Sequence, residues 1–156
     1  MPDSLDEVVW IHGAPNCSQT ADPLLQVHQY DADTFVLRQS KCFSFEGNFL
    51  YVLFGAARVL LLDAGARPDR AGTLLPIRET IDRIINQWLA TNGTPVLQLI
   101  VAHTHSHGDH VFWDSAFVGR ANTTIVPLDV LALKAFYGLA DWPDGRSLLD
   151  LGGRQL

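Results

Sequence analysis

The chain is poor in cysteine and lysine and has no excess of positive charge. Its only two cysteines, Cys17 and Cys42, are spaced neither as a metal knuckle nor as a redox pair. We therefore expect two reduced thiols, with a disulfide as the alternative. The 11 lysines and arginines are outnumbered by 17 acidic residues, for a net charge of -6, and form no basic stripe. Nucleic acid is therefore not an expected partner.

Export and membrane signals are also lacking. The first residues do not show the positive and then apolar pattern of a signal peptide. The longest apolar runs, such as Val59–Leu62, are far too short to span a bilayer. We therefore expect a cytoplasmic protein with no membrane partner. With 47% hydrophobic content, residues 1–156 suffice for one folded domain.

The first half of the chain has the apolar patterning of β-strands. Strands are predicted at Val8–Ile11, Leu25–Tyr30, Thr34–Leu37, Phe49–Phe54 and Arg58–Leu62. The short segments 31–33 and 55–57 predict hairpin turns. The last of these strands is apolar at consecutive positions, which is typical of a strand buried on both faces.

The second half changes its periodicity. Apolar residues recur at helical spacing from Ile77 to Leu89, which predicts an amphipathic helix with Trp88 in the core. A strand at Val96–Ala102, a short helix after His110, a strand at Thr123–Val126 and a helix at Leu128–Tyr137 follow. This order predicts the α/β class with a mixed sheet. The final residues, Leu148–Leu156, are interpreted as a turn entering a further strand, so we expect the front part of a longer domain.

Four of the six histidines lie within eight residues, directly after the apolar strand at Val96–Ala102. They are His103, His105, His107 and His110, with Asp109 among them. The carboxyl end of a strand is where α/β sheets present their sites. Imidazoles packed this closely repel one another as cations, and a divalent ion removes the repulsion by taking their lone pairs. The cluster predicts a metal site; the alternative is a solvated polar loop.

Local geometry indicates how the ligands are shared. Residues two apart in an extended chain point the same way, so His105 and His107 can hold one ion. Gly108 allows a sharp turn, after which Asp109 and His110 face a second position. Two-metal hydrolytic sites hold their ions roughly 3.5–4 Å apart, and this loop is short enough to serve both.

Residues 105–110, HSHGDH, have the His-x-His-x-Asp-His signature of the metallo-β-lactamase superfamily. The chain resembles that superfamily over residues 45–156. Val59–Leu62 followed by Asp63 and, two residues later, Gly65 resembles its earlier strand-Asp-x-Gly motif. His103 lies outside the signature, because a start there would require aspartate at position 107.

The resemblance implies a four-layer αββα sandwich with a metal site at one sheet edge. It implies one or two zinc ions, the first bound by His105 and His107 and the second by Asp109 and His110. A metal-bound hydroxide oriented by Asp109 would be the nucleophile, since zinc acidifies its bound water. The nitrogen ligand at position 107 favours zinc over iron. Asp63 would fix the metal loop by hydrogen bonds, the alternative being that it only forms a turn.

The chain departs from the superfamily's pattern in its later part. The superfamily takes further ligands, including a third histidine on the first metal, from the second half of the domain. No histidine follows His110 here. Residues 152–154 resemble the strand that leads to the segment with that histidine. We therefore expect only the N-terminal half of the sandwich, with the C-terminal half missing.

The leading hypothesis is a zinc-dependent hydrolase that cleaves an ester, thioester, lactone or amide of a small-molecule substrate. The alternative is a truncated, catalytically incomplete half domain that binds metal weakly and needs self-association or a complementing C-terminal half. A phosphodiesterase is a weaker alternative, because the acidic charge disfavours long nucleic acids.

Side chains beside the motif have ordinary structural interpretations. His103 is expected to make a hydrogen bond behind the metal loop, with a ligand role as the alternative. Phe112 and Trp113 are expected to pack the helix that follows, with a wall of the substrate pocket as the alternative.

Overall fold

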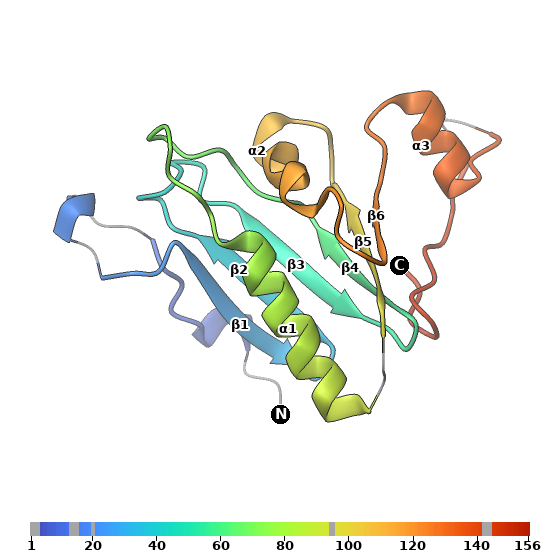
Figure 1. The fold of residues 1–156 in the computed structure, drawn as a ribbon, viewed down its shortest axis with the longest axis horizontal. Coiled ribbons are helices and arrows are strands. Elements are labelled where there is room, and N and C mark those ends of the chain that lie inside the picture. The colour runs from blue at the N-terminus through green and yellow to red at the C-terminus, as the bar shows by residue number, and fades with distance from the viewer. Residues whose placement is uncertain (1–3, 13–15, 20, 94–95, 142–144) are drawn as a thin grey trace.

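The computed structural model describes residues 4–12, 16–19, 21–93, 96–141 and 145–156 (Figure 1). Within them the strands are β1 (Leu25–Asp31), β2 (Thr34–Gln39), β3 (Phe49–Phe54), β4 (Arg58–Leu62), β5 (Gln98–Ala102) and β6 (Thr123–Ile125). The α-helices are α1 (Ile77–Asn92), α2 (Gly108–Val111) and α3 (Val130–Tyr137). Short 3-10 segments are η1 (Leu5–Glu7), η2 (Cys17–Gln19) and η3 (Phe112–Phe117). The predicted α/β class is confirmed.

The strands form one mixed sheet whose spatial order follows the chain from β1 to β6. β1 to β4 pair antiparallel, whereas β4, β5 and β6 run parallel. In the first hairpin Asp33 N donates to Asp31 Oδ1 at 2.8 Å, which closes the predicted turn. Parallel pairing of β4 with β5 requires a crossover, and α1 supplies it.

Side chains alternate between the two faces of the sheet, and different elements cover each face. α1 covers one face (Figure 1), where the main core contains Leu37, Leu50, Val52, Phe54, Val59, Leu61, Leu99, Val101, Ile77, Ile81, Ile84, Ile85 and Trp88. On the other face a smaller cluster of Leu60, Ile100, Ala102, Val126 and Leu151 packs against Leu133 and Tyr137 of α3. β4 and β5 are therefore buried on both faces, as their continuous apolar sequences predict.

The four-layer sandwich is not confirmed. The described strands belong to a single sheet with helices on its faces. A second sheet is absent from the described part of the chain, so the αββα arrangement stays a prediction.

The strand predicted at Val8–Ile11 does not form. The Gln26 side chain donates from Nε2 to Val9 O at 3.0 Å and accepts at Oε1 from Ile11 N at 2.7 Å. The Trp10 ring packs edge-on against His28, with ring centroids 5.6 Å apart. Because a glutamine side chain takes the hydrogen bonds that a neighbouring strand would make, this segment lies on the sheet without joining it.

The turn predicted within Leu148–Leu156 is confirmed, and the only pairing inside this segment is an isolated antiparallel bridge between Asp150 and Gln155. Gly152 and the glycine after it have φ angles of 93° and 86°. Asp150 Oδ1 accepts hydrogen bonds from the N–H groups of both glycines, at 2.8 and 3.0 Å. Ala57 N donates to Leu151 O at 3.0 Å. These contacts hold the segment against the turn between β3 and β4.

The expectation of reduced thiols is wrong, since Cys17 and Cys42 form a disulfide. The fold brings their Cα atoms to 5.3 Å across a sequence separation of 25, a proximity that spacing alone does not reveal. Disulfides persist mainly in oxidising compartments, so the bond does not favour the expected cytoplasmic location. In the described part of the chain, every helix is too short or too polar to cross a bilayer.

Candidate metal centre

The candidate centre lies where β4 and β5 end side by side. Leu62 and Ala102 are paired at the carboxyl ends of these parallel strands. The chain leaves each strand in a loop, and the two loops stay hydrogen-bonded. Asp63 N donates to Ala102 O at 2.8 Å, and Ala64 N donates to His110 O at 2.7 Å. The two sequence motifs therefore meet at the edge where α/β sheets present their sites.

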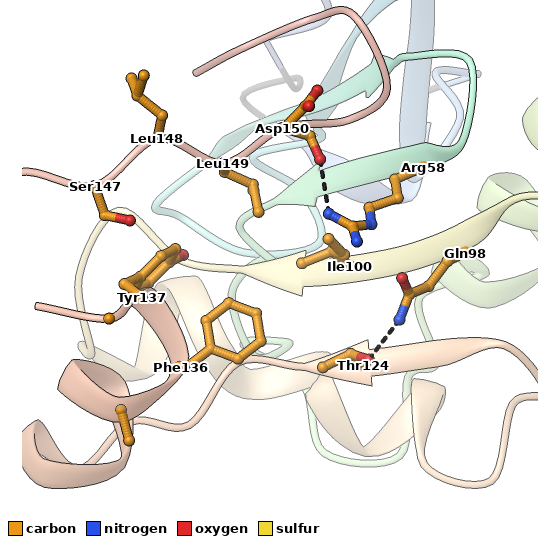
Figure 2. Close-up of a pocket in the computed structure, with 12 residues that line it drawn as sticks. Arg58, Gln98, Ile100, Thr124, Phe136, Tyr137, Ser147, Leu148, Leu149 and Asp150 are labelled. Carbon is orange, nitrogen blue, oxygen red and sulfur yellow. Dashed lines mark hydrogen bonds between the residues drawn. The ribbon is translucent and has the colours of Figure 1, made fainter.

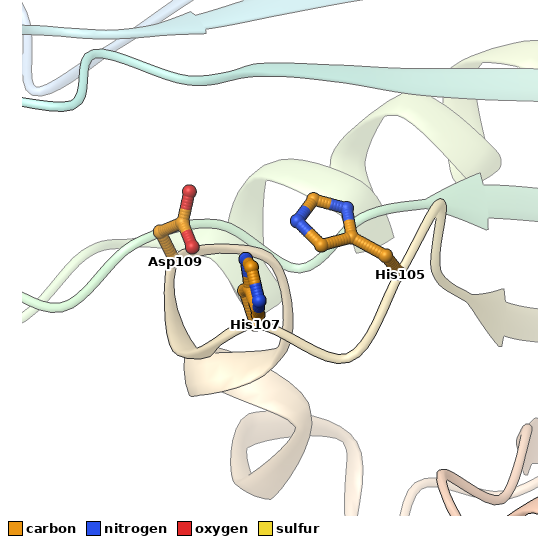
Figure 3. A group of neighbouring side chains, drawn as sticks. All are labelled: His105, His107 and Asp109. Carbon is orange, nitrogen blue, oxygen red and sulfur yellow. The ribbon is translucent and has the colours of Figure 1, made fainter.

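His105, His107 and Asp109 form the donor cluster of this edge (Figure 3). Each offers one nitrogen or oxygen atom, and these atoms lie within 4.8 Å of one another. The histidines are exposed, and their ring centroids are 4.6 Å apart. Figure 3 shows His105 and His107 on the loop that leads into α2 and Asp109 in the first turn of that helix. Imidazole and carboxylate donors at this spacing can hold a divalent cation.

His110, the fourth predicted ligand, lies directly beside this cluster. Its Nδ1 is 2.9 Å from Asp63 Oδ2, and its Nε2 is 3.1 Å from Asp109 Oδ2. When Nδ1–H donates to Asp63, the Nε2 lone pair remains available next to Asp109. The structure brings the four predicted ligands together; their binding of a metal stays a prediction.

Asp63 lies beneath the loop and is 2% exposed. Its Oδ1 accepts a hydrogen bond from Thr104 N at 2.8 Å, and the Thr104 hydroxyl lies 3.1 Å from each carboxylate oxygen. Asp63 also has a left-handed φ of 66°, which aspartate tolerates better than most other residues do. Through Thr104 and His110 it contacts both ends of the donor loop, so it does more than form a local turn.

Asp109, the predicted catalytic residue, is held as a carboxylate. Burial opposes its ionisation, but its own backbone N–H and the nearby His110 outweigh burial and keep the pKa of Asp109 below its ordinary value. Asn48 fixes the backbone at this point by donating from Nδ2 to Asp109 O at 2.8 Å. The ionised form binds cations and accepts hydrogen bonds at both oxygens without donating one.

His103 lies outside the donor cluster. Its side chain is 4% exposed, and its Nε2 is 2.8 Å from Asp114 Oδ1. This is the hydrogen bond behind the loop that the main interpretation of His103 predicts.

Sequence reasoning missed three residues that hold the loop: Thr104, Asp114 and Asn48. Thr104 lies directly before His105, so the sequence itself offers its hydroxyl as a candidate. Asp114 lies a few residues after the motif but is not part of a recognisable sequence pattern. Asn48 is 61 positions from Asp109, and only the tertiary structure brings the two together.

A cavity of about 410 Å³ opens beside Asp109. It is lined by Ser44, Phe45, Glu46, Ala66, Arg67, Asp69, Gly108, Asp109 and Phe112. Trp113 instead packs against the main core, and its Nε1 donates to Ala66 O at 2.8 Å. The packing interpretation therefore applies to Trp113, whereas Phe112 forms a cavity wall.

A larger cavity, of about 540 Å³, lies between α3, the amino ends of β4 and β5, and the C-terminal segment (Figure 2). Arg58, Gln98 and Tyr137 are among the residues that line it. None of the candidate metal ligands does so, and size alone does not make it the reactive site.

Comparison with known proteins leaves the family open. No family model matches this chain, and no curated protein matches it. The resemblance to the metallo-β-lactamase superfamily therefore remains a hypothesis that rests on the motif residues.

Proposed function

We propose that this chain carries the zinc-binding centre of a hydrolase that cleaves an ester, thioester, lactone or amide of a small molecule. The observation that carries the proposal is the convergence of His105, His107 and Asp109 within 4.8 Å. The position of this cluster, after parallel strands and next to a cavity, supports an active site rather than a chance polar loop.

The donor set fits zinc. Imidazole nitrogens and carboxylate oxygens are usual zinc ligands, and tetrahedral coordination at 2.0–2.1 Å separates ligand atoms by roughly 3.3 Å. His110 Nε2 and Asp109 Oδ2 already lie 3.1 Å apart. The Thr104 hydroxyl lies 3.1 Å from His105 Nδ1, and the exposed His107 ring packs against His105 with centroids 4.6 Å apart, so both rings lie at the same point of the loop. A bound zinc ion supplies Lewis acidity and a water that ionises near neutral pH.

The chain's own residues have separate tasks in this proposal. Asp109 accepts a hydrogen bond from the attacking water and so orients the water towards the carbonyl carbon. Asp63 accepts the Nδ1–H of His110, which keeps the Nε2 lone pair directed at the cation. Thr104, bonded to Asp63, keeps the start of the loop in place.

A second candidate is a chain that binds zinc but does not catalyse hydrolysis alone. The exposure of His105 and His107 favours it, because metal catalysis depends on a cavity that excludes bulk water. In this case activity requires a complementing segment or a second copy of the chain.

Metal analysis and a substrate panel test both candidates. The protein is stripped with a chelator and titrated with zinc by calorimetry, then assayed on an aryl ester, a thioester, a lactone, an amide and a phosphodiester. We expect one or two zinc ions per chain and carbonyl hydrolysis that chelation abolishes and zinc restores. Zinc binding without turnover supports the second candidate, and turnover of the phosphodiester alone supports the weaker sequence-based alternative. Absence of zinc binding contradicts both zinc proposals.

A further inference from the structure

We infer that the cavity beside Asp109 selects carbonyl substrates that carry both an aromatic or bulky aliphatic group and a carboxylate. This inference rests on the proposed function, because it assigns the substrate class of the same site. The link is Asp109, which belongs to the donor cluster and also lines the cavity. A molecule held in the cavity therefore lies next to the reactive residues. The volume of about 410 Å³ falls within the range of small-molecule sites.

Two exposed phenylalanines give the cavity its apolar character. Phe45 is 68% exposed and Phe112 is 45% exposed, and both line the cavity. Phe112 packs edge-on against Trp113, with ring centroids 5.2 Å apart, and Trp113 is hydrogen-bonded to Ala66. These contacts hold Phe112 in position before a ligand binds. A ligand ring placed against these side chains removes apolar surface from water on both partners, which favours binding.

Arg67 offers a charged partner in the cavity to the carboxylate of a ligand. It is exposed and lines the cavity, and no hydrogen bond or ion pair joins it to another residue in the described part of the chain. Asp69 Oδ2 accepts a hydrogen bond from Phe45 N at 2.8 Å, which holds this carboxylate in place. The negative charges of Asp69, Glu46 and Asp109 all oppose an anion. The binding of an anion therefore depends on a direct pair with Arg67. A guanidinium without a partner matches the geometry of a carboxylate, which it can bind through two parallel hydrogen bonds.

Ligand binding to the metal-free protein tests this inference without any hydrolysis. Calorimetry is performed with 3-phenylpropionate, its uncharged amide and propionate. We expect 3-phenylpropionate to bind most tightly. Phe112→Ala should weaken binding of both phenyl ligands about tenfold. Arg67→Ala should weaken only the carboxylate, also about tenfold, and Glu46→Gln should strengthen it.

Matched controls come from other surfaces of the chain. Phe136→Ala removes a 36% exposed ring from the larger cavity, and Arg83→Ala removes an exposed cation from α1. Neither should change the binding of any of the three ligands. Equal affinities for the acid and its amide, or equal effects of Arg67→Ala and Arg83→Ala, would overturn the inference.

Hydrolysis by the zinc-loaded protein separates this inference from the proposed function. Methyl acetate, methyl 3-phenylpropionate and monomethyl benzylsuccinate are compared by kcat/KM, which we expect to rise in that order. Zinc-dependent turnover with no such order overturns the cavity inference and leaves the hydrolase standing. Selective binding of 3-phenylpropionate without zinc binding or turnover supports the cavity inference and contradicts the proposed hydrolase.

Discussion

At the scale of single residues, His107 offers the simplest test of the metal centre. His107→Ala removes a nitrogen donor from the exposed cluster and leaves two of its three members. We expect zinc affinity to fall by more than about 100-fold, a larger loss than is usual for residues that only orient a ligand. Thermal stability should stay nearly constant, since exposed side chains contribute little to it. Calorimetry and a melting curve measure both effects.

His12→Ala is the control for this variant, because His12 is an exposed histidine outside the donor cluster. It should bind zinc like the unchanged protein. Equal zinc affinity in the two variants would show that the loop histidines do not form the site.

Asp63 is buried, unlike the exposed candidate ligands His105 and His107. Asp63→Asn keeps an oxygen for Thr104 but replaces the acceptor of His110 with either an amide donor or a weaker acceptor. We expect zinc affinity to fall about 10–100-fold and the free energy of unfolding to fall by about 2 kcal/mol. Zinc titration and urea denaturation measure these two quantities.

Asp129→Asn provides the matched control. Asp129 caps α3 by accepting from Ala132 N at 2.9 Å, and asparagine serves this purpose equally well. Zinc affinity and stability should therefore both remain unchanged. If Asp63→Asn loses stability but keeps full zinc affinity, Asp63 supports the fold and not the metal loop.

At the scale of elements, α1 is attached to the segment after η3 by a small charge network. Asp82 lies 2.8 Å from Arg78 Nε on the same helix and 2.7 Å from Arg120 Nε. Burial raises the pKa of Asp82, but hydrogen bonds and charge from Arg120 and Arg78 outweigh burial and lower it below the ordinary value. The crossover helix is thus tied by charge to the segment that leads into β6, and by apolar packing to the sheet.

This network predicts a dependence of stability on pH. A carboxyl whose pKa is lower in the folded state stabilises the fold above its unfolded pKa, and this contribution is lost as the pH falls through the folded pKa. Asp82→Asn should therefore reduce stability near neutral pH by about 0.5 kcal/mol, a small figure because the pair is partly exposed to solvent. The difference should shrink as the pH falls below the ordinary pKa of an aspartate and vanish below the lowered pKa of Asp82.

Urea unfolding at several pH values, with Glu46→Gln as the control, measures this effect. Glu46 is exposed, lies outside the helices, and makes no ion pair within the described part of the chain. Glu46→Gln should leave stability unchanged. An Asp82→Asn difference that persists at acid pH would contradict an electrostatic origin.

At the scale of the whole molecule, the disulfide ties the N-terminal segment to the loop between β2 and β3. Cys42 belongs to the same loop as Phe45, which lines the cavity, and Asn48, which bonds to Asp109. Cys17 lies in η2, before the first strand. The bond therefore restrains a segment that also contributes to the candidate site.

Removing the disulfide should lower the free energy of unfolding. The loop-entropy relation for a closed loop of about 25 residues gives a loss of about 3.5 kcal/mol for the Cys17→Ser, Cys42→Ser double variant. Urea denaturation with and without reductant measures it. Reductant should destabilise the unchanged protein by the same amount and leave the double variant unaffected. Titration of free thiols in protein purified without reductant should find none.

Local patterns predicted most of the architecture correctly. The helical spacing of isoleucines indicated α1, and the continuous apolar run in β4 indicated burial on both faces. The strand predicted at Val8–Ile11 failed because a long-range contact with Gln26 replaced backbone pairing. The turn predicted in the last segment did form, and two glycines with positive φ turn the chain back on itself there. At Val8–Ile11 a tertiary contact overrode the apolar pattern.

The sequence by itself determined the mixed α/β class and the composition of the histidine and aspartate loop, because strand and helix periodicity and motif spacing are local properties. Only the tertiary structure decided that Cys17 meets Cys42, that Asn48 reaches Asp109, and that a cavity with two phenylalanines adjoins the donors. These features join residues that are distant along the chain. Their proximity follows from the order of strands in the sheet and from the paths of the loops between them. No local sequence pattern encodes the strand order or the loop paths.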